Sequence, residues 1–432
     1  MEMMTSNSQL LEVTLADILR VVHPLKEDWT ARFFIIQELQ KVVQSIESLR
    51  GATVEPFGSF VSNLFTRWGD LDISIEVPNG SYISCPAKKH KLALLTDLIK
   101  ALRKRGGWRN LHFIQNARIP ILKFETHQNI SCDVSINNLS GQMKSKMLFW
   151  LNEIDGRFRD VVLLVKEWAK AHGVNEPKSG TLNSYSLSLL VVFHFQTCEP
   201  ALFPPLKDIY PGNMVDDLVG VRTLAEKKIQ DAFAVGINGY KSDKTRGINR
   251  SSLSELFISF LHKFCDLSSR AQTQGINIFT GSWEDISTNM RWLPRTYTLC
   301  IEDPFEQPVN TARTVSDRQL ERISEAFQTS LQLLSAPNLD QNSLLSTLAR
   351  PQITRFLSKA PAGSQTSNIN GTLPQSSYTK GTHAQYLRAG QQFYRTQQHP
   401  QNRSYGKQQT GPGQRSSQPM HSQAQQAWRP GS

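Results

Sequence analysis

The sequence predicts an α+β fold, with a mixed β-sheet and its helices in roughly the first 140 residues and a mainly helical region after them. Segments 70–77 and 130–136 alternate apolar and polar side chains, as half-buried strands do. Almost every segment after Asn137 has instead the 3.6-residue apolar spacing of helices. From about Pro361 the chain is rich in Gln, Ser, Gly, Pro and Asn. Such a composition buries too little apolar surface to offset chain entropy, so we predict a disordered tail.

The N-terminal elements follow from periodicity and from turn residues. Residues 28–49 carry helical apolar spacing, and Gly51 is a suitable residue to end that helix. Four strands are expected next, together with a helix near 88–104: 53–57, 70–77, 119–126 and 130–136.

Capping signals place two of the later helices. Ser252 with Glu255, and Ser316 with Gln319, form the spacing of capping boxes and predict helices that begin near 253 and 317. A weaker helix over 343–357 is interrupted by Pro351.

Composition restricts the class of protein. A chain of 432 residues with 39% hydrophobic content suggests two or three domains with buried cores. No apolar run reaches the ~18 residues of a membrane span, and the first residues lack the pattern of a secretory signal. The five cysteines are far apart and odd in number, which is typical of reduced thiols. We therefore expect a cytoplasmic protein without a membrane partner, with the nucleus as an alternative location.

The positive charge is concentrated near the C-terminus. From residue 336 onward ten Lys and Arg oppose one Asp, so this region carries +9 of the net +11. Arginines interleaved with aromatic side chains are suited to phosphates and RNA bases. A solubilising tail without a ligand is an equally good interpretation.

Asp70, Asp72 and Asp133 are the residues most indicative of chemistry. Asp70 and Asp72 are two apart at the start of one predicted strand, so they face the same way, and Asp133 lies on the polar face of another. Adjacent carboxylates repel each other unless a cation lies between them, and carboxylate oxygens suit Mg²⁺. Two such ions about 3.5–4 Å apart support in-line displacement at phosphorus. Asp-x-Asp alone is more often a solvated strand face, and it also occurs in sugar-nucleotide glycosyltransferases.

Gly58 and Ser59 precede these strands and open a predicted short helix. Backbone N–H groups and a hydroxyl at such a turn can bind a phosphate. A phosphate-binding turn beside a two-metal carboxylate site points to nucleotidyl transfer.

In this combination of motifs the chain resembles the template-free RNA terminal nucleotidyltransferases of the DNA polymerase β-like superfamily, and most closely the plant uridylyltransferases of small RNAs. The resemblance covers roughly residues 10–335. Besides the Gly-Ser and Asp motifs, it rests on four segments: 163–170 (LLVKEWAK), 179–186 (SGTLNSYS), 249–256 (NRSSLSEL) and 301–313 (IEDPFEQPVNTAR).

The resemblance implies a polymerase β-like nucleotidyltransferase domain and a helical, poly(A)-polymerase-associated central domain. The implied organisation is N-terminal helices packing on the core (1–50), the catalytic domain (51–140), the central domain (141–315) with a nucleotide-recognition loop at 301–313, a helix returning to the core (316–335) and the basic tail (336–432). On these bounds, a chain that ends near residue 335 would keep the active site.

The resemblance also implies roles for individual residues. Asp70, Asp72 and Asp133 match the catalytic carboxylates that hold two Mg²⁺ or Mn²⁺ ions. The remaining matches concern the nucleotide: Gly58, Ser59, Lys166, Lys170 and Ser184 for the phosphates, Tyr185 for stacking on the base, and Asp303 and Glu306 for the base pocket.

Two residues depart from the pattern of many members. Val309 stands where several uridylyl members have a His that disfavours purines, and Lys144 stands where many members have an Asn that contacts the ribose. Three functions therefore stay open. The first is a uridylyltransferase that adds UMP from UTP to the 3′ ends of small RNAs and promotes their decay, with small-RNA effector proteins binding the tail. The others are a poly(A) polymerase that uses ATP and a non-catalytic RNA-binding scaffold.

Overall fold

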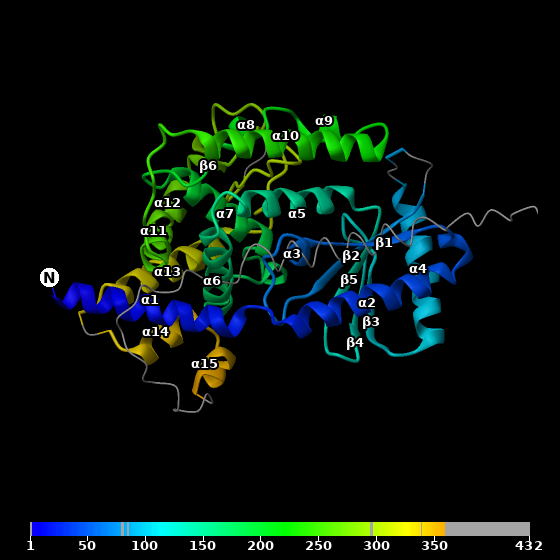
Figure 1. Cartoon of the computed structure of the whole chain (residues 1–432), viewed down its shortest axis with the longest axis horizontal. Coiled ribbons are helices and arrows are strands. Elements are labelled where there is room, and N and C mark those ends of the chain that lie inside the picture. Colours follow the sequence, from blue (N-terminus) through cyan, green and yellow to red (C-terminus); the bar gives the residue numbers. More distant parts are fainter. Residues whose placement is uncertain (1, 79–81, 84–85, 294–296, 338, 359–432) are drawn as a thin grey trace, which may run out of the picture. The chain divides into compact units, whose positions relative to one another are not determined.

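The computed structural model describes residues 2–78, 82–83, 86–293, 297–337 and 339–358, all within one compact unit (Figure 1). The predicted tail beyond residue 358 lies outside the described residues. Among the described residues, no helix combines the length and the apolar character needed to cross a membrane. The helices and strands are, in chain order, α1 (Glu2–Val22), α2 (Lys26–Gln44), η1 (Glu47–Leu49), β1 (Thr53–Phe57), α3 (Gly58–Val61), β2 (Leu71–Glu76), α4 (Lys88–Arg105), β3 (Trp108–Ile114), β4 (Ile121–Thr126), β5 (Ser131–Ile136), α5 (Leu139–Asn152), α6 (Arg157–Ala171), η2 (Pro177–Ser179), α7 (Ser184–Thr197), α8 (Leu206–Ile209), α9 (Met214–Asp217), α10 (Arg222–Ser242), α11 (Leu253–Lys263), α12 (Leu267–Arg270), β6 (Gln274–Asn277), β7 (Ser282–Asp285), α13 (Asp317–Leu334), α14 (Gln341–Leu348) and α15 (Pro351–Ser358).

A five-stranded mixed sheet organises the N-terminal half, as the sequence predicts. Its strand order is β1-β2-β5-β4-β3, and only the central pair β2–β5 is parallel. Leu71, Ile73 and Ile75 of β2 are fully buried, as is Val134 of β5. Helix α2 packs on β1 and helix α4 on β3, β4 and β5 (Figure 1). Because strand side chains alternate, the polar residues of β2 and β5 are left on the opposite face.

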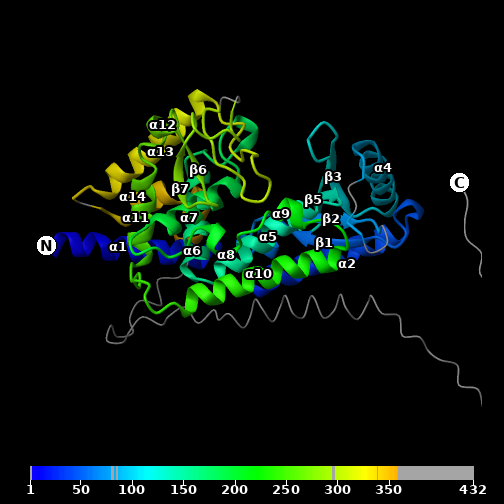
Figure 2. The same ribbon diagram turned by 90° about the horizontal axis from the view of Figure 1, so that it is seen from above.

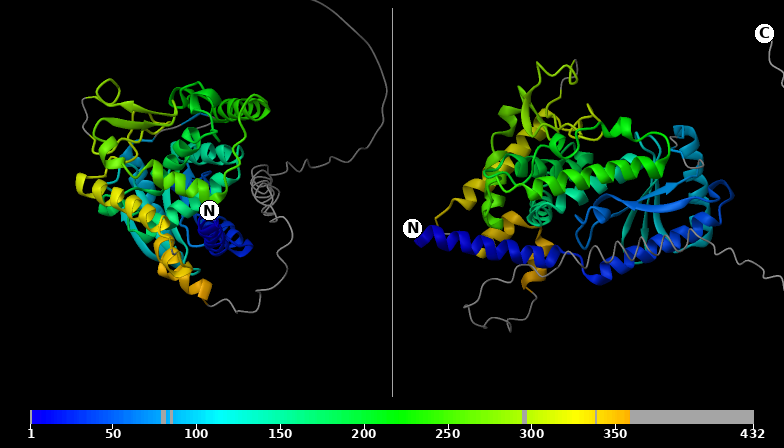
Figure 3. Two further views of the ribbon diagram at one scale, coloured as in Figure 1. Left: turned by 90° about the vertical axis from the view of Figure 1, so that its left-hand side faces the viewer. Right: turned by 45° about the horizontal axis from the view of Figure 1, so that its top comes forward.

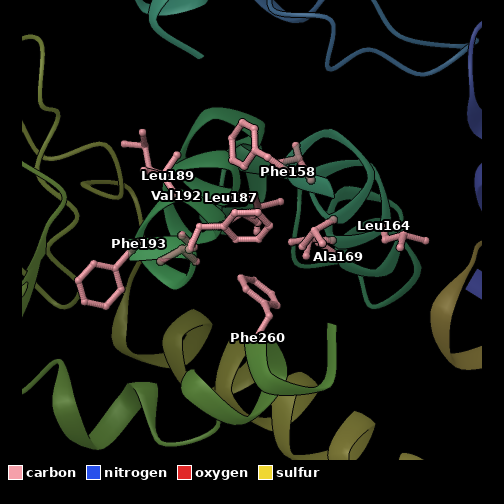
Figure 4. Packing of buried hydrophobic residues seen from close by; sticks show 14 of the residues in the cluster. Phe158, Leu164, Ala169, Leu187, Leu189, Val192, Phe193 and Phe260 are labelled. Atoms are coloured by element: carbon pink, nitrogen blue, oxygen red, sulfur yellow. The ribbon is translucent and has the colours of Figure 1, made fainter. Parts of the chain in front are cut away.

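The C-terminal half is helical, and its core is built from α6, α7, α11 and α13. Figure 4 shows Phe158 of α6 and Phe260 of α11 on opposite sides of the space between the helices, with Phe193 of α7 pointing to another side, and all three are fully buried. The sequence reason is that α7 carries apolar residues on all sides, with serines and a few larger polar side chains among them, as expected of a helix enclosed by others. Figure 2 shows this helical half at one end of the described chain and the sheet with α4 at the other.

The first and last described helices lie side by side in the helical half (Figure 3). Helix α1 contacts α6, α11, α14 and α15, and its residues Leu11, Leu15 and Ile18 are buried there. Leu344 of α14 and Ile353 of α15 are also fully buried. The packed core therefore continues well past residue 335, into the region from 336 onward that the predicted bounds assign to the tail.

Two N-terminal predictions differ from the structure. Helix α2 ends at Gln44 instead of 49, and a separate 3-10 turn then buries Leu49. Strand β3 was not predicted from the sequence, because a register shift between Arg109 and His112 interrupts its alternation. The other four strands are found within two residues of their predicted ends.

The two capping boxes have different outcomes. Ser252 and Glu255 form the predicted box, with Ser252 Oγ accepting from the Glu255 N–H and the Glu255 carboxylate from the Ser252 N–H. Helix α13 does begin at Asp317, yet the Ser316 side chain makes no capping hydrogen bond. Thr298 instead binds Asp317 in its first turn, with 2.7 Å between the two oxygen atoms. The helix near 343–357 is confirmed as α14 and α15, divided before Pro351.

Candidate active site

The three predicted carboxylates lie together on the polar face of the sheet. The parallel register of β2 and β5 sets Asp72 directly opposite Asp133. Residues that are paired in this way point to the same side of the sheet. Asp70 lies one residue before β2, rather than within it, and is about half exposed. The register of β2 and β5 therefore brings Asp72 and Asp133 to one face of the sheet, and Asp70 lies just before β2.

Lys123 of β4 is a fourth charged residue of this cluster and was not singled out from the sequence. It is paired in register with Asp133, and its Nζ lies 3.1 Å from Asp133 Oδ1 and 3.6 Å from Asp70 Oδ2. The alternation of 121–126 places Lys123 on a polar face, but its partner depends on strand order. In the described ranges, no group of three or more His, Cys, Asp or Glu side chains is arranged to hold a metal ion as it stands. Two of the three carboxylates are paired with the lysine instead.

The carboxylates remain short of positive charge despite this lysine. Burial, together with the charges of Asp133 and Asp70, raises the pKa of Asp72 to about 7. Burial likewise raises the pKa of Asp133, although Lys123 opposes the shift. Raised carboxyl pKa values of this origin mark a place where an added cation is favourable. The donor set, which consists of carboxylate oxygens, fits Mg²⁺ or Mn²⁺.

Gly58 brings the backbone of the Gly-Ser turn against Asp72. Its φ is +68°, and a Cβ at this position would lie 1.9 Å from Asp72 Oδ2. No residue with a side chain fits without displacing that carboxylate. The Gly58 N–H donates to Ser145 Oγ over 2.7 Å, which fixes the turn from α5. Ser59 follows directly in α3, so of the two predicted turn residues it is Gly58 that lies against a carboxylate.

Lys166 of α6 is buried next to the segment that follows the Gly-Ser turn, and Lys170 lies one helical turn further along the same helix. Lys166 is 7% exposed, and its Nζ donates to the carbonyl oxygen of Leu64 over 3.0 Å. The Leu64 N–H in turn donates to the carbonyl of Ser59. Burial and the charge of Lys170 lower the pKa of Lys166 to about 7, with Asp72 opposing the shift. Lys166 therefore supports the Gly-Ser turn from within, instead of lying on a solvated helix face.

Ser184 and Tyr185 begin α7 and point in different directions. Asn183 caps the helix, its Oδ1 accepting from the Ser186 N–H. Ser184 is exposed, and its Oγ donates to Asn175 Oδ1 over 3.2 Å. The Tyr185 hydroxyl lies 3.4 Å from Asp303 Oδ1 and donates to it. Burial and the two nearby carboxylates raise the pKa of Tyr185 well above its usual range, so its hydroxyl stays protonated.

Asp303 and Glu306 lie together in the loop after the isolated bridge at residues 301–302, and α5 supplies a cation to both. Lys144 Nζ lies 2.5 Å from Asp303 Oδ2 and 3.2 Å from Glu306 Oε2. Arg118, from the turn between β3 and β4, donates to Glu306 Oε2 over 2.8 Å, and Ser140 donates to Glu306 Oε1 over 2.6 Å. Burial would raise the pKa of Glu306, but Lys144, Ser140 and Arg118 lower it to about 2. The sequence had indicated both acids but not Arg118 or Ser140, which are distant in the chain.

Comparison with known proteins places the chain in a family. Residues 11–151 match the family model described as "Poly(A) RNA polymerase, mitochondrial-like, central palm domain". Protein HESO1 of Arabidopsis thaliana is 52% identical over 399 residues, which cover 92% of this chain and 76% of the relative. Terminal uridylyltransferase cid1 of Schizosaccharomyces pombe is 27% identical, covering 66% and 69%. Poly(A) RNA polymerase GLD2 of Mus musculus is 29% identical over 74% of this chain, which spans only 62% of that relative.

Solved structures show the same fold. The structure titled "Structural Basis for the Activity of a Cytoplasmic RNA Terminal U-transferase" matches with a TM-score of 0.61 and 24% identity, over 79% of this chain and 98% of the other. A mitochondrial poly(A) polymerase structure, titled "Crystal structure of mtPAP in complex with UTP", matches with a TM-score of 0.62 and 20% identity, covering 78% and 72%. The expected polymerase β-like architecture is therefore confirmed. The chain belongs to the template-free RNA terminal nucleotidyltransferases of the DNA polymerase β-like superfamily, in the group that contains HESO1.

Proposed function

We propose that this protein is an RNA 3′-terminal uridylyltransferase that adds UMP from UTP to small RNAs and so promotes their decay. The observation that carries the chemistry is the pairing of Asp72 with Asp133 on adjacent parallel strands, with the Gly58 backbone against Asp72. The choice of UTP rests on the 52% identity with HESO1 and on the similarity to a protein named terminal uridylyltransferase.

Asp70, Asp72 and Asp133 would hold two Mg²⁺ or Mn²⁺ ions. Bound there, such ions lower the pKa of the attacking 3′ hydroxyl and neutralise charge on the triphosphate. The chain's own residues position the reactants. The Gly58–Ser59 turn offers the N–H and the hydroxyl of Ser59 to the triphosphate, because the Gly58 N–H is already bound to Ser145 Oγ, and Lys166 keeps that turn in place through Leu64. Tyr185 offers its ring to the base, which gives affinity without base selectivity.

Lys170 and Ser184 complete the proposed nucleotide site. Burial and Arg350 lower the pKa of Lys170, while Glu167 and Asp70 oppose that shift. A cation in that environment gains a favourable partner when a triphosphate arrives. The exposed Ser184 hydroxyl can turn from Asn175 toward the phosphates.

The assignment is tested by incubating the purified full chain with a short RNA, Mg²⁺ and each nucleoside triphosphate in turn, followed by an equimolar mixture. Extension mainly by uridine supports the proposal. Faster extension with ATP would identify a poly(A) polymerase, and no extension with any nucleotide would favour the RNA-binding scaffold.

Binding of Mg²⁺ to the proposed site is expected to weaken as the pH falls below about 7. The pKa of Asp72 is raised to about 7, so below that pH an ion must displace a proton. Because the pKa of Asp72 is higher in the folded chain than in the unfolded chain, protonation of this carboxyl also stabilises the fold. This stabilisation is complete below the ordinary pKa of 3.8 and is lost as the pH rises through about 7. Calorimetric titration with Mg²⁺ at pH 6 and 8, in buffers of different ionisation enthalpy, measures both the affinity and the released proton. Equal affinity at the two pH values would contradict this expectation.

Val309→His is expected to leave UTP use intact and to reduce ATP use further. The Val309 N–H donates to the Glu306 carbonyl, and its own carbonyl accepts from the Asp303 N–H, so the side chain belongs to the loop that carries both acids. The imidazole ring of histidine is larger than the valine side chain, so it would narrow the space available to a purine base. Changes of one pocket side chain typically alter discrimination about tenfold to a few hundredfold. Competition between UTP and ATP measures the ratio, and an unchanged ratio would place Val309 away from the base.

We further propose that the region after residue 358 holds RNA, and small-RNA effector proteins, near the site in the cytoplasm or nucleus. Eight of its residues are Lys or Arg and none is acidic. Removing residues 359–432 should shorten the added tails and give RNA binding a shallower dependence on salt, because fewer counterions are released. Filter binding at several salt concentrations provides the slope, and an identical slope in both chains would limit the region to a solubilising or partner-binding role.

A further inference from the structure

A buried ion-pair cluster joins α5, α7 and the loop after Ile301, and its centre is Lys144. The side chain of Asp303 is 2% exposed and that of Lys144 is 16% exposed. Lys144 contacts both Asp303 and Glu306, and Arg118 provides a second positive charge to Glu306. Two negative and two positive charges balance within the cluster.

The oxygens of both acids are already occupied by protein donors. Asp303 Oδ1 accepts from the N–H groups of Phe305 and Glu306 over 2.9 and 3.2 Å, and Oδ2 accepts from Lys144. On Glu306, Oε1 accepts from Ser140, while Oε2 accepts from Arg118 and Lys144. These carboxylates are therefore poorly placed to accept a hydrogen bond from the amino group of a base, because each would first have to give up a charged or backbone donor.

In contrast to these two carboxylates, Lys144 has hydrogen-bonding capacity left for a base. An ammonium carries three N–H bonds, and within the described part of the chain two of them are directed to Asp303 and Glu306. Its Nζ lies over the Tyr185 ring, 5.5 Å from the ring centre, so it lies next to the position that a base stacked on this ring takes in the proposed function. What the protein presents at this edge of the base is a positively charged donor.

A donor at this edge distinguishes bases by their exocyclic groups. Uracil has a carbonyl oxygen at position 4, which accepts a hydrogen bond, whereas cytosine has an amino group there and adenine one at position 6. An amino group facing an ammonium leaves two donors opposed and unpaired, and such mismatches strongly lower the specificity constant. We propose that Lys144 is a specificity-determining residue that donates to the 4-carbonyl of uracil, with Asp303 and Glu306 acting as its positioning residues. This inference rests on the proposed uridylyltransferase function and adds the chemical basis of nucleotide choice.

The competing explanation is that Lys144 only balances the charge of the two acids. Both explanations predict a loss of stability when the lysine is removed, but only ours predicts a change in the choice between two pyrimidines of equal size. The experiment therefore measures the ratio of kcat/KM for UTP and CTP, in which general losses of activity cancel. Lys146→Met is the matched control, because Lys146 lies on the same helix and pairs with Glu226 over 2.6 Å, away from the loop.

Single-nucleotide addition to a short RNA is measured with UTP, CTP, ATP and pyrimidin-2-one ribonucleoside triphosphate, which lacks the 4-carbonyl and the N3–H of uracil. In the unchanged protein, UTP should exceed both CTP and the pyrimidin-2-one analogue by about 10- to 100-fold. Lys144→Met should remove most of both preferences, and Lys146→Met should retain them. Thermal unfolding of each variant is measured alongside.

The outcomes separate this inference from the function on which it rests. A UTP preference that survives in active Lys144→Met overturns the inference and leaves the uridylyltransferase assignment standing. Should Lys144→Met not fold, equal use of UTP and the analogue by the unchanged protein also overturns it, and weaker use of 4-thiouridine triphosphate, which keeps the N3–H but has a poorer acceptor at position 4, supports it. Preference for ATP in the unchanged protein overturns both.

Discussion

Asp133→Asn and Asp72→Asn are each expected to abolish nucleotide addition while the chain remains folded. Each removes one of the two carboxylates that the β2–β5 register sets opposite each other, and the site would no longer hold both ions. Losing one metal ion raises the activation free energy of an in-line displacement by several kcal/mol, which lowers the rate on the order of 10³-fold or more. Extension of a short RNA with UTP is the measurement. Activity within tenfold of the unchanged protein, in either variant, would contradict a two-ion mechanism.

The same substitutions should stabilise the metal-free fold at pH 8. The raised pKa of Asp72 shows that its charge is unfavourable in the folded state, so a neutral amide removes a repulsion. Glu125→Gln is the matched control, since Glu125 lies on the neighbouring strand β4 and binds Asn110 over 2.8 Å. A higher melting temperature for Asp72→Asn than for this control, combined with lost activity, is the expected signature of a functional carboxylate.

A chain that ends at residue 335 is expected to be unfolded or strongly destabilised, whereas one that ends at residue 358 should fold and remain active. The shorter chain lacks α14 and α15 and uncovers the apolar surface that Leu344 and Ile353 fill. It also lacks Arg350, whose Nε and Nη2 donate to the two oxygens of Glu167 over 2.7 and 2.8 Å. Glu167 is fully buried, and removing one partner of a buried pair typically costs about 3–5 kcal/mol.

That loss is large compared with the roughly 5–15 kcal/mol by which a domain is stable. Thermal unfolding followed by circular dichroism distinguishes the two chains, and Arg350→Gln in the full chain isolates the ion pair. Equal melting temperatures for chains ending at 335 and 358 would show that the last two helices add no stability. A stable but inactive shorter chain would indicate instead that Arg350 acts on α6 and its lysines.

Features set by neighbouring residues in the chain can be predicted from the sequence, whereas contacts between distant segments cannot. Alternation places Asp72 and Asp133 on polar strand faces, and the strands form where expected because their apolar faces fit a core. The contact of Lys123 with Asp133 depends on β4 lying next to β5, and no pattern along the chain carries that information.

The burial of individual side chains is the other property that could not be predicted from the sequence. Lys166 has the spacing of a solvated face, yet α6 is enclosed by α1, α7, α11 and α14, so its ammonium is buried on the Leu64 carbonyl. Lys144 is read from the sequence as a departure from a family pattern, while its two carboxylate partners lie about 160 residues further along the chain. Pairings at such distances are fixed by tertiary structure alone.

The contact of α1 with α14 and α15 has a consequence for biosynthesis. The apolar side of α1 is covered by helices that end at Ser358, more than 330 residues later. At a translation rate of about 5–20 residues per second, the first helix leaves the ribosome roughly 20–70 s before these covering helices are synthesised. During that interval Leu11, Leu15 and Ile18 lack part of their native cover. The nascent chain should therefore depend on chaperones that bind exposed apolar helices, and synonymous codon changes that slow translation of the last third should lower the yield of folded protein.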